Sequence, residues 1–301
     1  MVAVGALLSL LASVCFNVNN LMEKRAVDGL SSISFQRPGR MVRALVTSRL
    51  WMAGFAIGVV AGALLALGYS LAPTIVVQSI FGAGVVLLVL GARWYLAEQL
   101  GRREHLGIAL FVVALVLVSA TFGASTTRVV ANPVSSVVIV SAATTAIAGV
   151  GFWLLRSRAI DSGVVFGVTS GLLYGVASLQ TKAASALLEL HGTIGGIPWL
   201  LESPYPYVFL GASLLGLFTF QTGLQRCRLA ILSPLTSTLA SVFVVIAGMI
   251  VYREPLPHNA LLASLRFLGF AMVLLGGGML ATSSTSATMF NGVPGDVITD
   301  Q

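Results

Sequence analysis

Long apolar stretches separated by short polar links follow one another along almost the whole chain of 301 residues. A helix needs about 20 mainly apolar residues to cross the roughly 30 Å of membrane hydrocarbon. By that measure the pattern predicts nine transmembrane helices, at residues 2–22, 50–70, 73–92, 105–122, 134–155, 162–181, 205–224, 229–251 and 260–281. The expected fold class is therefore all-α, a polytopic membrane bundle forming a single domain over residues 1–281.

The composition points the same way. Hydrophobic residues make up 57% of the chain and charged residues only 9%, whereas soluble proteins carry roughly 25% charged residues. A water-soluble globular domain is therefore excluded. Residues 282–301 differ from the rest, because they are rich in Ser and Thr and then acidic. We expect a disordered cytoplasmic tail there.

The number of basic residues alternates between high and low from one link between predicted helices to the next. Links after odd-numbered predicted helices hold 13 Lys and Arg residues, and links after even-numbered helices hold 3. Cytoplasmic loops retain Lys and Arg, so a multi-pass protein of the cell membrane (inner or plasma) is expected, with its N-terminus outside and its C-terminus in the cytoplasm. The net charge of +7 then reflects topology, and no nucleic-acid partner is expected.

Two polar segments interrupt the pattern. Residues 31–48 contain Arg40 and Arg43, and they fit an amphipathic helix on the cytoplasmic surface or an ordered basic loop. Residues 192–207 contain three prolines and fit a re-entrant or surface-lying segment on the opposite side.

The chain also contains an internal repeat. Residues 69–98 align with residues 225–254, and residues 13–24 align with residues 171–182. The two copies begin at the first and sixth predicted helices, so an odd number of crossings separates them and their orientations are opposite. Inverted repeats of this kind are typical of secondary transporters. We expect the first repeat at about 1–122, a linking helix at 134–155 and the second repeat at about 162–281.

These repeated segments resemble a known family. The run ALGYSLAPTIVVQ at 66–78, followed by a helix that ends in Leu-Ala-Glu at 96–98, resembles the drug/metabolite transporter (EamA-like) superfamily. The corresponding segments of the second half are QRCRLAILSPLTS at 225–237 and Tyr-Arg-Glu at 252–254. The nine predicted helices, the missing second helix of the usual five-helix unit and SVCFNVNNLMEK at 13–24 most resemble the NIPA branch. That branch is described as nine-helix magnesium transporters, and the resemblance implies transport.

Polar side chains lie along one face of two predicted helices. The first helix carries Ser9, Ser13, Asn17, Asn20 and Lys24 at helical spacing, and the sixth carries Ser170, Tyr174, Ser178 and Lys182. Polar groups in hydrocarbon must face protein or a water-filled cavity. The stripes can therefore line a cavity or bond one helix to another. The expected substrate-binding residues are Asn17, Asn20, Gln78, Tyr174, Ser178, Lys182, Gln221 and Gln225.

Other roles for these residues remain open. Gln78, Gln221 and Gln225 can cap or join helices. Lys24 fits a positive-inside anchor, and Lys182 fits a contact to an anionic substrate or to Glu189.

Acidic residues are absent from the middle of every predicted span. Mg²⁺ is usually held by one or two carboxylates together with retained waters. A magnesium route would then depend on neutral oxygen atoms around a hydrated ion, and metal ligands are left unassigned. No cofactor motif is found, and His105, His191 and His258 stand apart, without the pairing that catalysis needs. An enzyme is therefore not expected.

The sequence thus predicts a secondary transporter that moves a small solute by alternating access through a central polar cavity. The solute can be a metabolite, a drug-like compound or a divalent cation such as Mg²⁺. Two alternatives remain open: a non-transporting scaffold or accessory subunit of an envelope assembly, and a flippase for lipid substrates. The expected partners are a small-molecule or ion substrate and the lipid bilayer, and the oligomeric state, a homodimer included, is open.

Overall fold

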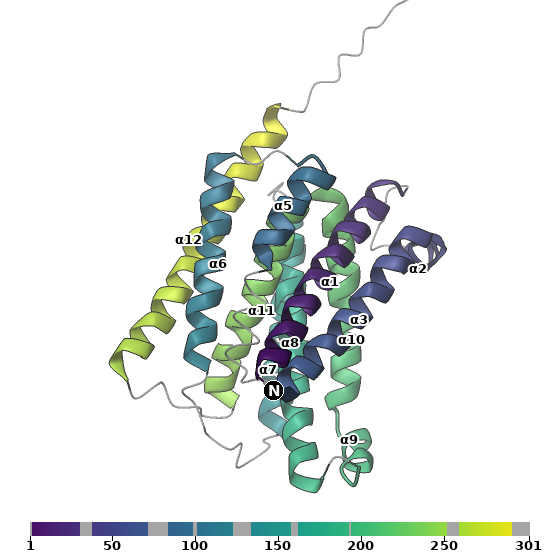
Figure 1. Cartoon of the computed structure of the whole chain (residues 1–301), viewed down its shortest axis with the longest axis vertical. Coiled ribbons are helices and arrows are strands. Elements are labelled where there is room, and N and C mark those ends of the chain that lie inside the picture. The colour runs from purple at the N-terminus through teal and green to yellow at the C-terminus, as the bar shows by residue number, and fades with distance from the viewer. Residues whose placement is uncertain are drawn as a thin grey trace, which may run out of the picture.

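The computed structural model describes residues 2–30, 38–71, 84–98, 101–122, 134–157, 162–192, 194–251 and 259–290. Within these ranges the chain is helical and contains no strand, which confirms the all-α fold class. The elements are α1 (Val2–Asp28), α2 (Pro38–Thr47), α3 (Arg49–Leu71), α5 (Val85–Tyr95), α6 (Arg102–Phe122), α7 (Val134–Ser157), α8 (Ser162–His191), α9 (Ile197–Glu202), α10 (Tyr205–Arg226), α11 (Leu229–Val251) and α12 (Ala260–Phe290). Figure 1 shows the long helices side by side in one bundle.

Five of the described helices are long and apolar enough to cross a membrane. They are Ala3–Asp28, Val134–Leu154, Val164–Leu188, Tyr205–Arg226 and Leu229–Val251. A sixth is gained if α2 and α3, which meet at 86°, form one bent span. The protein is therefore a multi-pass membrane protein. The count of nine stays a prediction, because much of the predicted span 73–92 falls outside the described residues and α6 and α12 contain only shorter apolar stretches.

Three helices continue well beyond the ends that the apolar pattern predicts. α1 runs to Asp28 rather than residue 22, α8 runs to His191 rather than residue 181, and α12 runs to Phe290 rather than residue 281. A prediction from apolar length ends a span at the first polar or charged residues. Backbone hydrogen bonds do not depend on side-chain polarity, so the helix itself can continue beyond that point. Residues 282–290 are thus helical, and the tail predicted from 282 can lie only at 291–301, outside the described residues.

The first helix places its polar face inside the protein and its apolar face outside. Its predicted polar stripe is buried at every position: Ser9, Ser13, Asn17, Asn20 and Lys24. The opposite face exposes apolar side chains, at Val4, Leu7, Leu10, Leu11, Val14 and Val18. This distribution is the reverse of a soluble helix and suits contact with lipid.

Close contacts fix the direction of the helices in the first half. Gly68 of α3 lies against Ser9 near the start of α1, and Gly54 of α3 lies against Met22 near its end. α1 and α3 are therefore antiparallel. Gly91 of α5 lies against Leu21 of α1.

The second half has a corresponding pair. Gly223 of α10 lies against Phe166 near the start of α8, and Gly216 lies against Tyr174 further along it. α8 and α10 are therefore antiparallel. In contrast, α11 follows the direction of α8, because its contact residues rise in number together with the glycines of α8.

A contact between the halves relates their directions. Lys24, near the end of α1, donates a hydrogen bond to the carbonyl of Leu224, near the end of α10. The two helices therefore end on the same side of the bundle, and α8, antiparallel to α10, runs opposite to α1. In Figure 1, α8 ends and α10 begins near α9 at the lower end of the molecule.

The two polar segments contain short helices. α2 lies within residues 31–48 and buries Met41 and Leu45 while its arginines Arg40 and Arg43 are exposed. Residues 31–37 lie outside the described part. α9 lies within residues 192–207, and it begins after Gly196 with Pro198 in its first turn, where a missing N–H is tolerated.

Candidate functional site

A cavity of about 520 Å³ lies between five helices from both halves of the chain. Binding pockets for small molecules commonly measure about 300–1,000 Å³. The lining residues come from α1, α3, α8, α10 and α11: Phe16, Asn19, Asn20, Glu23, Phe55, Gly58, Val59, Tyr174, Leu217, Phe220, Ser233, Thr236, Ser237 and Ala240. Most of this surface is apolar, and its polar groups converge from α1 and α11.

Glu23 is the charged group in the wall. It is 4% exposed and lies near the end of the candidate span Ala3–Asp28, just beyond residue 22, where the apolar pattern ended the first predicted span. One carboxylate oxygen, Oε2, accepts a hydrogen bond of 2.6 Å from Nε2 of Gln221 on α10. The other, Oε1, accepts one of 2.9 Å from Nδ2 of Asn19, once that amide is oriented to satisfy its neighbours.

The carboxylate of Glu23 has amide partners, and no basic side chain in the described part of the chain forms an ion pair with it. The neighbouring Lys24 forms its ion pair with Asp28. A buried charge is costly unless it is paired. The wall therefore presents an acidic group that is held in place and not neutralised by a basic side chain.

Two amide side chains near Glu23 each have one atom without a hydrogen-bond partner. Nδ2 of Asn20 is buried and has no hydrogen-bond partner, although Asn20 lines the cavity. Oε1 of Gln221 is likewise buried without a partner. Unsatisfied buried polar atoms are rare in folded proteins. Here they lie beside the cavity and on the side chain that holds Glu23.

Aromatic side chains form much of the remaining wall. Phe16 comes from α1, Phe55 from α3, Tyr174 from α8 and Phe220 from α10. The rings of Tyr174 and Phe220 pack edge to face, with their centroids 6.3 Å apart. Rings from four helices thus surround a space that also contains one carboxylate.

The predicted site residues divide into several groups. Asn20 and Tyr174 line the cavity, and Gln221 contacts it through Glu23. Asn17 instead joins helices: its Nδ2 donates 2.9 Å to the carbonyl of Gly84 and 2.7 Å to that of Ser13.

Three further predictions fall outside the cavity wall. Ser178 is exposed, and its hydroxyl donates to the carbonyl of Tyr174 within α8. Lys182 is half-buried and is not among the side chains that line the cavity. Gln78 lies outside the described residues.

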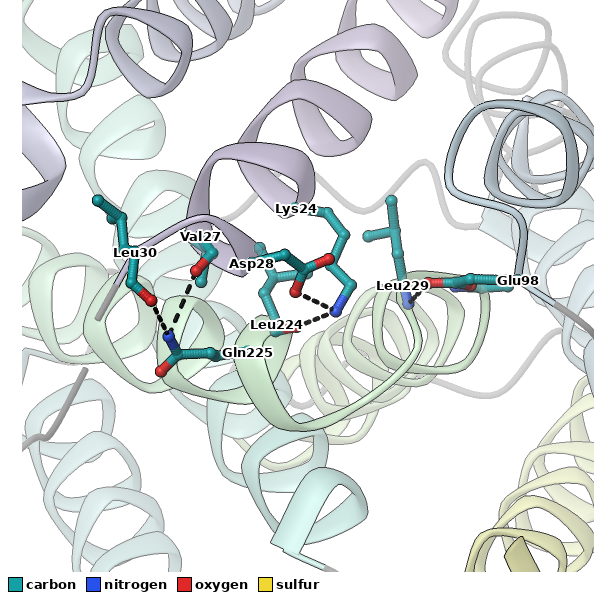
Figure 2. A network of polar contacts seen from close by, with 9 residues as sticks. Lys24, Val27, Asp28, Leu30, Glu98, Leu224, Gln225 and Leu229 are labelled. Atoms are coloured by element: carbon teal, nitrogen blue, oxygen red, sulfur yellow. Dashed lines mark hydrogen bonds and ion pairs between the residues drawn. The ribbon is translucent and has the colours of Figure 1, made fainter. Parts of the chain in front are cut away.

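Polar contacts that we call the helix-end network join the end of α1, the end of α10, the start of α11 and Glu98. Its members are Lys24, Val27, Asp28, Leu30, Glu98, Leu224, Gln225 and Leu229, which Figure 2 labels, together with Ala230. Nζ of Lys24 donates 2.5 Å to the carbonyl of Leu224 and 2.8 Å to Oδ1 of Asp28. Nε2 of Gln225 donates to the carbonyls of Val27 and Leu30, at 3.3 and 3.1 Å. The predicted binding residue Gln225 thus ties the end of α1 to α10, and Lys24 does more than anchor a loop.

Glu98 connects the same network to α11. Its carboxylate accepts hydrogen bonds from the backbone N–H groups of Leu229 and Ala230, at 2.8 and 3.2 Å. An anion at a helix N-terminus is stabilised by the free N–H groups there. Ala97, just before Glu98, has φ of +55°, an uncommon value for a residue other than glycine. Burial raises the pKa of the Glu98 carboxyl, and the two N–H donors with the charges of Lys24 and Arg228 act against that rise.

No group of three or more His, Cys, Asp or Glu side chains in the described ranges could hold a metal ion. A divalent cation in the cavity would have Glu23 as its acidic ligand, together with neutral oxygens and its own waters.

The fold and the site define a class: a multi-pass membrane protein with a cavity between its helices and one buried acid in the described part of the wall. Over 291 residues the chain is 26% identical to a protein of Arabidopsis thaliana named as probable magnesium transporter NIPA9, covering 92% of this chain and 81% of that protein. No protein-family model and no solved structure matches the chain. The similarity confirms a relationship to a NIPA-like transporter and agrees with a protein that is not an enzyme. Membership of the wider drug/metabolite transporter superfamily stays a prediction.

Proposed function

We propose that this protein is a secondary transporter that carries a positively charged solute through the cavity, with Glu23 as its charged binding group. The observation that carries the proposal is the carboxylate of Glu23, which is buried in the cavity wall and forms no ion pair with a basic side chain of the described residues. A cation that enters the cavity supplies the missing charge, and one that leaves restores the unpaired state. Ionisable groups inside membrane bundles commonly mark such pathways.

The similarity to a protein named as a magnesium transporter makes Mg²⁺ the first inorganic substrate to examine. Asn20 and Gln221 are suited to meet the solute or its waters, because each has a buried amide atom without a partner. The predicted roles of Asn20, Tyr174 and Gln221 are retained in this proposal, and Glu23 and Asn19 are added to them.

We further propose alternating access between two inverted repeats within nine transmembrane helices. Three observations support this: α1 pairs with α3 as α8 pairs with α10, α8 runs opposite to α1, and the cavity lies between the halves. Binding between inverted halves is the common arrangement in secondary transporters. The helix-end network is then the closed end, which must open by releasing Lys24 and Gln225 from their carbonyl partners.

Uptake into liposomes tests this function. The purified protein is reconstituted, and entry of Mg²⁺ and of amine-containing solutes is compared with that in protein-free liposomes. We expect saturable entry of a cation that falls in Tyr174→Ala, with the protein still correctly inserted. Cation entry that equals that of protein-free liposomes would favour the scaffold alternative. Transfer of a labelled lipid without cation entry would favour a flippase.

Orientation is tested separately by cysteine labelling. A single cysteine at Arg128 is expected to react with an impermeant reagent from outside, and one at Arg156 only after the membrane is opened. The reverse pattern would overturn the proposed external N-terminus and cytoplasmic C-terminus.

A further inference from the structure

The wall of the cavity distinguishes between classes of cation. Glu23 is the only acidic side chain among the described residues that line it. The described part of the wall thus offers one negative charge.

One negative charge balances a monovalent cation and not a divalent one. A Mg²⁺ ion beside Glu23 alone would leave an excess positive charge in a mainly apolar pocket, where uncompensated charge is poorly solvated. Mg²⁺ also gives up its waters reluctantly, and those waters need acceptors. Each oxygen of Glu23 accepts one hydrogen bond, from Asn19 or Gln221, so the carboxylate is fixed in position and keeps lone pairs for a cation.

Two hydroxyl groups of the wall donate their hydrogen bonds within the protein. Oγ of Ser237 donates to the carbonyl of Ser233 or Pro234 within α11. Oγ1 of Thr236 lies 3.2 Å from the carbonyl of Gly167 and 3.1 Å from Oγ of Ser170 on α8. These bonds hold α11 to itself and to α8, and the hydroxyl oxygens keep lone pairs that can accept a further hydrogen bond but add no negative charge.

The aromatic side chains of the wall favour an organic cation over Mg²⁺. Phe16, Phe55, Tyr174 and Phe220 present rings from four helices to the same space as Glu23. The face of an aromatic ring attracts cations, and ammonium groups that carry apolar substituents are bound in aromatic cages for this reason. The volume of about 520 Å³ accommodates such an organic cation, whose apolar groups can also contact Val59, Leu217 and Ala240.

We propose that the substrate is a monovalent organic cation, an alkylated or aryl-substituted ammonium, whose charge pairs with Glu23 and whose apolar groups lie among the rings of Phe16, Phe55, Tyr174 and Phe220. The proposal rests on the proposed function and names the substrate class of the same cavity. Asn20 adds a donor, Nδ2, for a polar group of the substrate.

Binding and uptake of tetraethylammonium test this assignment against Mg²⁺. Both ions are measured with the full-length protein, by titration calorimetry in detergent and by uptake into liposomes. We expect saturable tetraethylammonium binding that weakens about tenfold or more in Glu23→Gln, and several-fold in Phe16→Leu and Phe220→Leu. Phe267→Leu is the matched control, because Phe267 is 55% exposed on α12 and does not line the cavity.

The outcomes separate the substrate class from the function. Glu23-dependent uptake of Mg²⁺ that tetraethylammonium does not inhibit would overturn the organic-cation assignment and leave the transporter in place. Uptake of neither ion, with correctly inserted protein, would count against both. Tetraethylammonium binding that is equal in the wild type, Glu23→Gln and Phe16→Leu would also overturn the assignment. Phe16 is 39% exposed, so Phe16→Leu is expected to fold even if Phe220→Leu does not.

Discussion

α1 and α8 occupy corresponding places in the two halves, yet their inner faces differ. At the offset of 158 residues that aligns them, Ser9, Ser13 and Asn17 of α1 correspond to glycines of α8, at Gly167, Gly171 and Gly175. The glycines allow α11 to pack directly on α8. A Cβ atom at Gly171 would lie 2.9 Å from the carbonyl oxygen of Thr236, and one at Gly175 would lie 2.6 Å from Phe243.

The difference continues toward the ends of the two helices. Glu23 of α1 corresponds to Thr181 of α8, which is exposed and bonds only to the carbonyl of Ala177 in its own helix. Small residues favour close packing of membrane helices, whereas an ionisable group inside the membrane is costly and points to function. α8 is therefore the helix of the pair that packs closely on α11, and in the proposed function α1 carries the charged binding group. In the proposed repeat, aligned positions thus have two different uses.

Replacing Glu23, the charged residue of α1, should have the largest effect of the substitutions that compare α1 with α8. In Glu23→Gln we expect cation uptake to fall at least about 30-fold, the equivalent of about 2 kcal/mol lost when one partner of a buried charge pair is removed. Thr181→Val should change uptake little. The measurement is the initial rate of uptake into liposomes, at matched protein density.

Thermal stability provides the control for that result. Without a cation, Glu23→Gln should be at least as stable as the wild type, because an unpaired buried carboxylate has been neutralised. Equal cation uptake by Glu23→Gln and the wild type would show that Glu23 of α1 is not the charged binding group.

Filling the glycine stripe should have the next largest effect. Gly171→Ala forces a methyl group against Thr236 and Leu239, and such overpacking costs about 1–3 kcal/mol. Gly211→Ala on α10 is the matched control, because a Cβ atom there meets nothing within 4 Å. Denaturation in detergent should show a lower free energy of unfolding for Gly171→Ala only. Equal stability of the two variants would mean that α8 and α11 are not in close contact.

Lys24→Met should have an intermediate effect that is confined to the helix-end network. It removes the hydrogen bonds to Leu224 and Asp28, and a hydrogen bond from a charged group contributes about 1.5–3 kcal/mol at most. We expect faster hydrogen exchange at the end of α1 and at residues 224–230. Lys182→Met, at the corresponding position of α8, should leave those residues unchanged. An unaltered exchange pattern in Lys24→Met would show that the helix-end network does not close this end of the cavity.

Asn20→Ala should have the smallest effect on stability. Nδ2 of Asn20 has no partner to lose, so the change in the free energy of unfolding is expected to stay within about 0.5 kcal/mol. Substrate affinity should nevertheless fall a few-fold. Asn17→Ala is the comparison, because Asn17 bonds to Gly84 and its loss should cost about 1 kcal/mol. A large loss of stability in Asn20→Ala would indicate that the residue joins helices instead.

Part of this organisation could be predicted from the sequence. Apolar length and turn residues predicted where most helices lie, and helical spacing predicted the polar face that α1 buries. Glu23 was missed because the count of apolar residues ended the first span at residue 22, although the polar stripe continues to Lys24. A carboxylate one turn from Asn19 and Asn20 was the signal that could have placed it inside.

The amino-acid sequence by itself determined a helical membrane protein, because hydrocarbon admits long apolar helices and few charges. It also determined which helix carries polar groups, since side chains three or four residues apart share a face. Only the tertiary structure decided that Glu23 and four aromatic rings line one cavity, that Gln221 holds Glu23, and that Asn17 and Gln225 join helices. The physical reason is that each polar side chain can bond a neighbour or face a space, and the packing of distant helices decides which is available.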